Sequence, residues 1–255
     1  VLAKVYPAAD LDFYSFTATA GDRIYATTMT SGSAGNSTNS QLTLLGSDGT
    51  TIIEFDEDNG SFSSTSASIA GAVIPTTGTY YLKVNDASPT NNIRGYDLYV
   101  QTRTGAPTPE TEPNSSSASA NTGITWASGD RLPSDADYYA FPVAAGDTVF
   151  LSLDLDPERD GTTWNGRLGL GLFGDIGNQI GVVDDAGTAD TRPSEAFFMT
   201  VKEAGTYFAY VDSATAGTGG PTATYHLNIS VFPRVPVGVN TTVYTSTDIP
   251  KTIGP

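Results

Sequence analysis

The chain has 255 residues, no cysteine, and 28 acidic against 12 basic residues, which gives a formal net charge of −16. The absence of cysteine excludes disulfides, thiolate nucleophiles and zinc–thiolate sites, and the negative charge argues against nucleic acid or an anionic membrane as a partner. No apolar run approaches the roughly 18 residues that span a bilayer, so we expect no membrane insertion.

The first hundred residues alternate between apolar and polar side chains, which is the pattern of half-buried β-strands. Turn sequences rich in Gly, Asp, Ser and Asn separate these stretches, as in the turns at 21–22 and 46–49. We therefore expect strands at residues 13–18, 23–29, 42–45, 51–55, 69–74, 78–84 and 96–100.

The same order of motifs recurs in the second half of the chain. A strand that begins with Asp10 and Asp12 and ends in an Ala-Gly-Asp turn returns with Asp135 and Asp137 in the acidic positions. The later motifs follow at offsets of about 125 to 129 residues, which confines insertions to loops. Two copies of one antiparallel β-sandwich are the economical explanation.

The alignment of the two copies can be made residue by residue. It matches Leu42 and Leu44 with Leu170 and Leu172, and the Gly-Thr-Tyr motif at 78–80 with the one at 205–207.

Composition marks the boundaries between these parts. The stretch 104–113 contains three prolines and reads as a stiff, extended linker. The tail after Pro233 has strand character, with Val235, Val237, Val239 and Val243 on one face, and Pro236 confines it to a sheet edge. We predict an N-terminally truncated sandwich, a linker, a second sandwich, and an extended tail or start of a further domain, at 1–103, 104–113, 114–233 and 234–255.

The motifs of the second half, in their order, resemble the bacterial pre-peptidase C-terminal (PPC) domain. They are the Glu-Pro-Asn segment at 112–114, the Asp-x-Asp-Tyr-Tyr-x-Phe strand at 135–141, the Ala-Gly-Asp turn, and the Gly-Thr-Tyr and Tyr-x-Leu strands. The first half resembles the same family over 10–101 but lacks the Glu-Pro-Asn segment. A shorter stretch, 243–251, resembles the opening of the P domain of proprotein convertases.

The PPC resemblance implies a jelly-roll-like β-sandwich without catalysis of its own, attached to a secreted protease or another exported protein. It also implies Ca²⁺ between the Glu-Pro-Asn segment and the first strand. Carried over to this chain, the ligands are Glu110, Glu112, Asn114, Asp135 and Asp137, which places the ion at the interdomain junction. Ser115 stands where the family has an aspartate, so one anionic ligand is missing.

The residue chemistry leaves alternatives beside this assignment. Carboxylates and an amide are ligands that Ca²⁺ prefers, yet Asp135 and Asp137 also suit an edge strand that discourages aggregation. The acidic stretch 154–161 imitates the start of an EF-hand, but its twelfth position from Asp156 is Arg167, so we predict a solvated acidic loop.

The sequence offers no constellation for catalysis. The one histidine, His226, is expected on the surface, and no Gly-x-Ser-x-Gly nucleophile motif is present. Trp164, in a polar loop, is the best candidate for an exposed aromatic that contacts a polymer. We therefore predict that the chain is not an enzyme.

The prediction is an all-β chain of two tandem jelly-roll-like antiparallel sandwiches that acts as an accessory or adhesive module, extracellular or on the bacterial cell surface. Its expected partners are a protein or polysaccharide surface. One alternative is a subunit of a fibre or surface layer, in which the C-terminal strand completes the sheet of a neighbouring copy. Another is an accessory fragment of a secreted protease.

Overall fold

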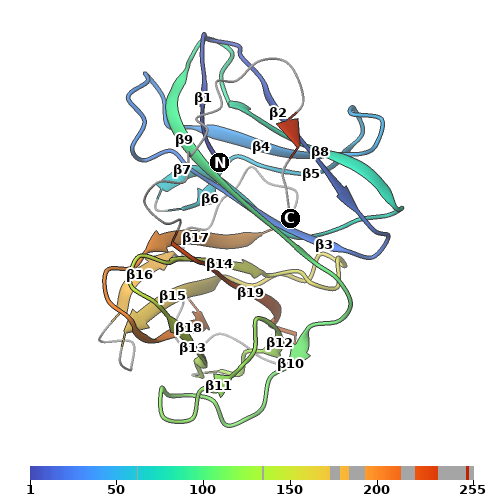
Figure 1. The fold of residues 1–255 in the computed structure, drawn as a ribbon. Coiled ribbons are helices and arrows are strands. Elements are labelled where there is room, and N and C mark those ends of the chain that lie inside the picture. The colour runs from blue at the N-terminus through green and yellow to red at the C-terminus, as the bar shows by residue number, and fades with distance from the viewer. Residues whose placement is uncertain are drawn as a thin grey trace. The chain divides into compact units, whose positions relative to one another are not determined.

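The structure is a computed structural model, and all of its regular secondary structure is β-strand in the residues that it describes (Figure 1). These are residues 1–61, 63–133, 135–172, 179–183, 193–213, 222–234 and 251–252. The prediction of an all-β fold is confirmed. None of these residues forms a helix long and apolar enough to cross a membrane.

The chain divides into two compact units. The first contains residues 1–105 and the C-terminal strand β20, and the second contains the described residues between 106 and 234. Each unit forms its own pair of sheets.

The described strands of the first unit form two five-stranded sheets, both antiparallel except for the pairing of β20 with β2. One sheet has the order β1 (Leu2–Val5), β9 (Ile93–Arg103), β3 (Arg23–Met29), β7 (Ser63–Val73) and β6 (Asn59–Gly60). The other has the order β20 (Lys251–Thr252), β2 (Asp12–Ala18), β8 (Gly78–Asp86), β4 (Ser40–Leu45) and β5 (Ile52–Asp56).

The described strands of the second unit also form two five-stranded sheets, and each has a short parallel strand at one edge. One sheet has the order β10 (Thr108–Pro109), β12 (Trp126–Asp130), β19 (Thr224–Phe232), β14 (Thr148–Asp154) and β17 (Ser194–Thr200). The other has the order β11 (Asn121–Thr122), β13 (Asp137–Val143), β18 (Gly205–Ser213), β15 (Gly166–Leu172) and β16 (Gln179–Val183).

The two units share their strand order. The run β1-β9-β3-β7 corresponds to β12-β19-β14-β17, and the run β2-β8-β4-β5 corresponds to β13-β18-β15-β16. The ladders correct one detail of the sequence alignment. Leu44 lies opposite Leu82 on β8, and Leu170 lies opposite Ala209 on β18, so the partner of Leu170 is Leu44 and not Leu42. The error is two residues, and a shift of two keeps every side chain on its face.

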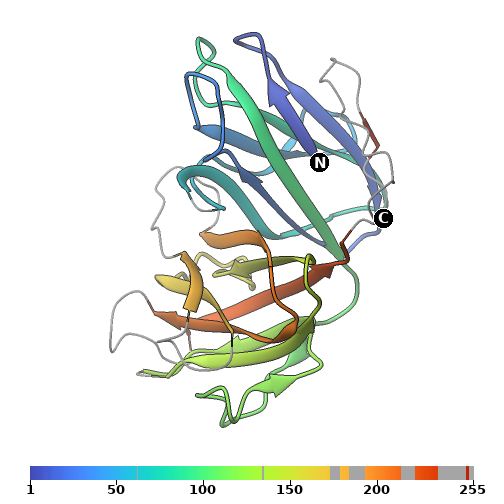
Figure 2. The ribbon, with the colours of Figure 1, turned by 60° about the vertical axis from the view of Figure 1, so that its left-hand side comes forward.

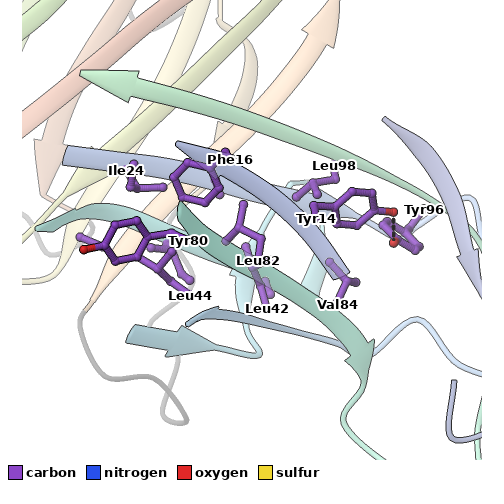
Figure 3. Close-up of a cluster of buried hydrophobic side chains, with 14 of the residues drawn as sticks. Tyr14, Phe16, Ile24, Leu42, Leu44, Tyr80, Leu82, Val84, Tyr96 and Leu98 are labelled. Atoms are coloured by element: carbon purple, nitrogen blue, oxygen red, sulfur yellow. Dashed lines mark hydrogen bonds between the residues drawn. The ribbon is translucent and has the colours of Figure 1, made fainter. Parts of the chain in front are cut away.

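The core of the first unit lies between its two sheets (Figure 3). Tyr14 and Phe16 of β2 and Leu44 of β4 face Ile24 of β3 and Leu98 of β9, and all five are buried. Burying one such side chain stabilises the fold by roughly 1.5–3 kcal/mol. The alternation of apolar residues along the strands is therefore explained by this single apolar layer.

The second unit has its own core of the same kind. Leu151 and Leu153 of β14 and Phe197 of β17 pack with Tyr139 and Phe141 of β13. Each unit thus buries its own apolar layer between its own two sheets.

The segment predicted as a linker is largely part of the second unit. β10 pairs in parallel with β12, with Thr108 opposite Ala127 and Pro109 opposite Ser128. The division between the units falls between Gly105 and Ala106. Prolines at this position suit a sheet edge, where no ladder hydrogen bond is needed from their nitrogen.

The C-terminal tail contributes one described strand. β20 pairs in parallel with β2, with Tyr14 opposite Lys251 and Ser15 opposite Thr252, and its short arrow lies beside β2 (Figures 1 and 2). The predicted valine stripe of the tail, and all but the last residue of the stretch that resembles a P domain, lie outside the described residues.

Candidate metal centre

Glu110 is fixed to β12 by two hydrogen bonds to main-chain groups of that strand. Its N–H donates to the carbonyl of Ser128 at 2.9 Å, and its Oε1 accepts from the N–H of Asp130 at 2.8 Å. The parallel strand β10, which ends one residue earlier, sets this register. The carboxylate is thereby held at the edge of the sandwich.

Three side chains from two strands of the core complete the surroundings of Glu110. The hydroxyls of Tyr139 and Tyr225 donate to Glu110 Oε2 at 2.9 and 2.7 Å. The two hydroxyls lie 2.7 Å apart, and Tyr225 Oη lies 2.9 Å from Asp137 Oδ2. Each hydroxyl has only one proton to donate. The two tyrosines therefore cannot donate to Glu110, to Asp137 and to each other at the same time.

The acids of the leading segment converge on this network. One oxygen each from Glu110, Glu112 and Asp137 lie within 4.8 Å of one another. Asn114 joins them, because its N–H donates to Glu112 Oε2 at 2.9 Å and its Nδ2 donates to Glu110 Oε2 at 3.2 Å. The carbonyl of Asn114 accepts from the N–H of Tyr138 at 3.0 Å, which fastens the segment to β13.

The electrostatics of the cluster are those of crowded carboxylates. Burial, reinforced by the charge of Glu110, raises the pKa of Asp137 to about 8. Burial also raises the pKa of Glu112, and Asp135 and Glu110 add to that effect. The pKa values of Tyr139 and Tyr225 are raised as well, first by burial, so both hydroxyls remain protonated donors at neutral pH.

Two buried oxygens of the cluster have no hydrogen-bond partner among the described residues: Asn114 Oδ1 and Asp137 Oδ1. A buried polar atom without a partner is costly, and both atoms belong to ligand types that Ca²⁺ prefers. A cation coordinated by these two oxygens and by two or more carboxylates would give the oxygens a partner and would offset the repulsion between the carboxylates. The donor set of Glu110, Glu112, Asn114 and Asp137 therefore fits a hard divalent ion.

Asp135 stands apart from the other four predicted ligands. It is half-buried, its Oδ1 accepts from the N–H of Ala136 at 2.9 Å, and it does not belong to the group of acids around Asp137. Its charge nevertheless acts at short range, since it contributes to the raised pKa of Asp137.

Gly129 makes room for the carboxylate of Glu110. A Cβ at position 129 would lie 2.5 Å from both Glu110 carboxylate oxygens and 2.5 Å from Tyr225 Oη. Neither this glycine nor the two tyrosines was predicted as part of the site. Tyr139, two residues after Asp137, was the one signal in the sequence for this part of the site. A tyrosine at an inward-facing strand position, however, indicates core packing by default.

An acidic groove lies beside the cluster in the second unit. Its volume is about 440 Å³, and its wall includes Glu110, Asp130, Glu158, Tyr225 and His226. His226 was expected on the surface. It is instead half-buried, and its ring makes an edge contact with Trp126 at a centroid distance of 5.9 Å.

Two further predictions about loops are wrong. Trp164 is not an exposed platform: it packs partly buried against the core, and its Nε1 donates to the carbonyl of Thr224 at 2.9 Å. The acidic stretch 154–161 is not a solvated loop, because Asp154 and Asp156 are fully buried. Asp154 pairs with Arg159 at 2.9 Å, and Asp156 accepts from the N–H of Asp160 at 3.1 Å.

The first unit contains the same inner network without the acidic segment. Tyr14 Oη lies 2.6 Å from Tyr96 Oη (Figure 3). Tyr96 also donates to Asp12 Oδ2 at 2.8 Å. Asp12, Tyr14 and Tyr96 thus correspond to Asp137, Tyr139 and Tyr225. Within the described residues, no comparable group of three acids gathers around Asp12.

Residues 10–86 match the family model of the bacterial pre-peptidase C-terminal domain. This is a family of non-catalytic accessory domains, and the match lies in the first unit. The predicted resemblance to this family is thus confirmed for residues 10–86, and the resemblance of the second unit stays a prediction.

Two solved structures are similar to parts of the chain. The pre-peptidase C-terminal domain of collagenase from Bacillus anthracis is 18% identical, with a TM-score of 0.31, over 50% of this chain and 100% of that chain. The CUB1-EGF-CUB2 domain of human MASP-1/3 is 10% identical, with a TM-score of 0.24, over 89% of this chain and 96% of that one. No curated protein sequence matches the chain.

Proposed function

We propose that the chain is a non-catalytic accessory module of a secreted or cell-surface bacterial protein, and that Ca²⁺ fastens residues 110–114 to the second sandwich. The observation that carries this proposal is the convergence of Glu110, Glu112 and Asp137 near two buried oxygens that have no hydrogen-bond partner in the part of the chain that the structure describes. A bound cation would supply the positive charge that the cluster lacks. All of these residues belong to the second unit, so the ion would act within that unit.

The proposal includes a tandem arrangement, in which the second unit is another copy of the PPC module. The shared strand order and the two matching Asp–Tyr–Tyr networks support it. The family match also favours a secreted protease as the parent protein, and a peptidase domain encoded in the same reading frame would test that point. Targeting to a protein or polysaccharide surface stays a prediction.

The calcium proposal is tested by titration calorimetry and by thermal unfolding. Both tryptophans, Trp126 and Trp164, lie in the second unit, so intrinsic tryptophan fluorescence follows that unit selectively. We expect Ca²⁺ to bind the metal-free chain and to raise the melting temperature seen by tryptophan fluorescence. EDTA should reverse the effect.

Variants locate the ion. Glu110→Gln and Asp137→Asn should each weaken calcium binding by about tenfold or more, because affinity follows the number of charged ligands. Glu203→Gln, which changes an exposed acid of the same unit, and Asp12→Asn, which changes the counterpart in the first unit, should leave the affinity unchanged. A metal-free chain that takes up no Ca²⁺ and melts identically with EDTA would refute the proposal.

A further inference from the structure

The outer edge of β13 in the second unit is covered by a short parallel strand. β11 pairs with β13 so that Asn121 lies opposite Tyr139 and Thr122 opposite Ala140. This strand comes from the segment that leads into the unit. The edge that remains after β13 has paired with β18 is therefore not open at this point.

The corresponding edge of the first unit, on β2, is covered in the same way by a strand from elsewhere in the chain. β20 pairs in parallel with β2, and Lys251 and Thr252 lie opposite Tyr14 and Ser15. Both short strands are parallel, both are two residues long, and both pair with two consecutive residues of the neighbouring strand.

The register of the two pairings is the same. Tyr14 and Tyr139 are equivalent residues, since each is the third residue of its strand. Each also bonds through its hydroxyl to a second buried tyrosine, Tyr96 in the first unit and Tyr225 in the second. Lys251 on β20 therefore takes the place that Asn121 takes on β11. Two segments with different sequences and different positions in the chain occupy one structural position.

This coincidence points to main-chain recognition. The two strands have threonine at the second position but differ at the first, where Lys251 replaces Asn121. Strand pairing itself uses N–H and C=O groups that every non-proline residue has. An uncovered edge of this kind is a template for an added strand, and strand addition gains affinity from main-chain hydrogen bonds.

We propose that the edge of β2 is a strand-acceptor site, and that its occupant is the C-terminal segment of this chain around β20. The site takes a parallel, extended strand in the register that β11 has on β13. The segment completes the first sandwich as β11 completes the second. This inference is independent of the calcium proposal, because it concerns the other unit and rests on main-chain pairing.

Two double variants of the full chain test the role of main-chain pairing. In Lys251→Pro with Thr252→Pro, the missing N–H groups and the fixed φ prevent pairing. In Lys251→Ala with Thr252→Ala, the main chain keeps its donors. We expect hydrogen exchange of the β2 amides that face β20 to be about tenfold faster in the proline variant and unchanged in the alanine variant. The amides of β13 serve as the internal reference in both.

A peptide in trans tests the specificity of the site. A synthetic peptide of residues 240–255 should restore the slow exchange of β2 in the proline variant, and the same peptide with proline at its positions 251 and 252 should not. Equal exchange in the proline and alanine variants, or equal protection by both peptides, would overturn the proposal.

A cysteine pair gives a readout that does not depend on a destabilised variant. The natural chain has no cysteine, so Ser15→Cys with Thr252→Cys creates a single possible disulfide between opposed positions. Gln41→Cys with Thr252→Cys is the control, because β4 is separated from β20 by two strands. Selective cross-linking of the first pair, within one chain or between two copies, supports the acceptor site, and its failure contradicts the site.

Discussion

The two units of the chain contain the same buried network of one aspartate and two tyrosines, but they differ in what lies above it. In the second unit, Glu110 accepts from both tyrosine hydroxyls. Glu112 lies close to Glu110 and Asp137, and the N–H of Asn114 donates to Glu112. In the first unit, the hydroxyls of Tyr14 and Tyr96 bond to each other, and that of Tyr96 donates to Asp12. The strands of the sandwich therefore supply one aspartate and two tyrosines in both units, and only in the second unit does the leading segment add two further carboxylates.

One position, on β12 in the second unit and on β1 in the first, differs between the units in a way that fits this difference. Gly129 on β12 lies opposite Tyr225, and Ala3 on β1 lies opposite Tyr96. Ala3 is buried in the core of the first unit, whereas a methyl group at 129 would collide with Glu110. The space that a methyl group fills in one unit is left for a carboxylate in the other.

The largest expected effect tests whether the two cores are independent. Leu44→Ala and Leu170→Ala remove equivalent, fully buried side chains, and each should cost about 2–5 kcal/mol in the free energy of unfolding. Only Leu170→Ala should shift the transition seen by tryptophan fluorescence in urea, and Leu44→Ala should shift the one seen by circular dichroism.

The matched control for these cavities is Ile52→Ala, because the side chain of Ile52 is 57% exposed. It should change either transition little. A tryptophan transition that moves as far in Leu44→Ala as in Leu170→Ala would show that the units unfold together.

The second prediction uses the protonation of Asp137 to separate the units. Its pKa is about 8 in the folded chain and about 3.9 when unfolded, so between these values the folded state binds more protons. Without Ca²⁺, the stability that protonated Asp137 contributes to the second unit should therefore be full below a pH of about 4 and be lost as the pH rises to about 8. One group contributes at most about 1.4 kcal/mol per pH unit.

Urea unfolding followed by tryptophan fluorescence in EDTA measures this slope. Asp137→Asn should flatten it, because asparagine does not titrate. Ca²⁺ should also flatten it, since the bound ion favours the ionised carboxylate. The idea fails if the variant retains the slope of the natural chain.

The third and smallest effect tests the role of the space at Gly129. Gly129→Ala should weaken calcium binding by about tenfold, or about 1.4 kcal/mol, because its Cβ would lie 2.5 Å from the carboxylate oxygens of Glu110. Calorimetry measures this directly. Ser128→Ala, on the same strand, and Ala3→Gly, in the other unit, should leave calcium affinity intact.

The fold could be predicted from the sequence to the extent that it depends on alternation along strands. Period-two patterns mark the strands around Tyr14 and Leu82 because each buries every second side chain. The same pattern cannot fix an alignment to better than two residues, which explains the misplaced partner of Leu170. It also says nothing about strands as short as β10, β11 and β20.

The sequence indicated the acidic residues of the candidate site but not the residues that hold them in place. Glu110, Glu112, Asn114 and Asp137 lie together, as the family resemblance implied, and calcium itself stays a prediction. The contributions of Tyr139 and Tyr225 could not be read from the sequence, because a buried tyrosine shows its hydroxyl partner only when the strands are assembled. Gly129 was missed for the same reason.

The pairing of β20 with β2 has a consequence for biosynthesis. A chain leaves the ribosome from its N-terminus, and domains generally fold as they emerge. The second sandwich receives β11 before its main strands are made, whereas the first must wait for residues 251 and 252. While residues 104–250 are being synthesised, the first sandwich therefore lacks the strand that pairs with β2, and that edge can be covered only after β20 has been made.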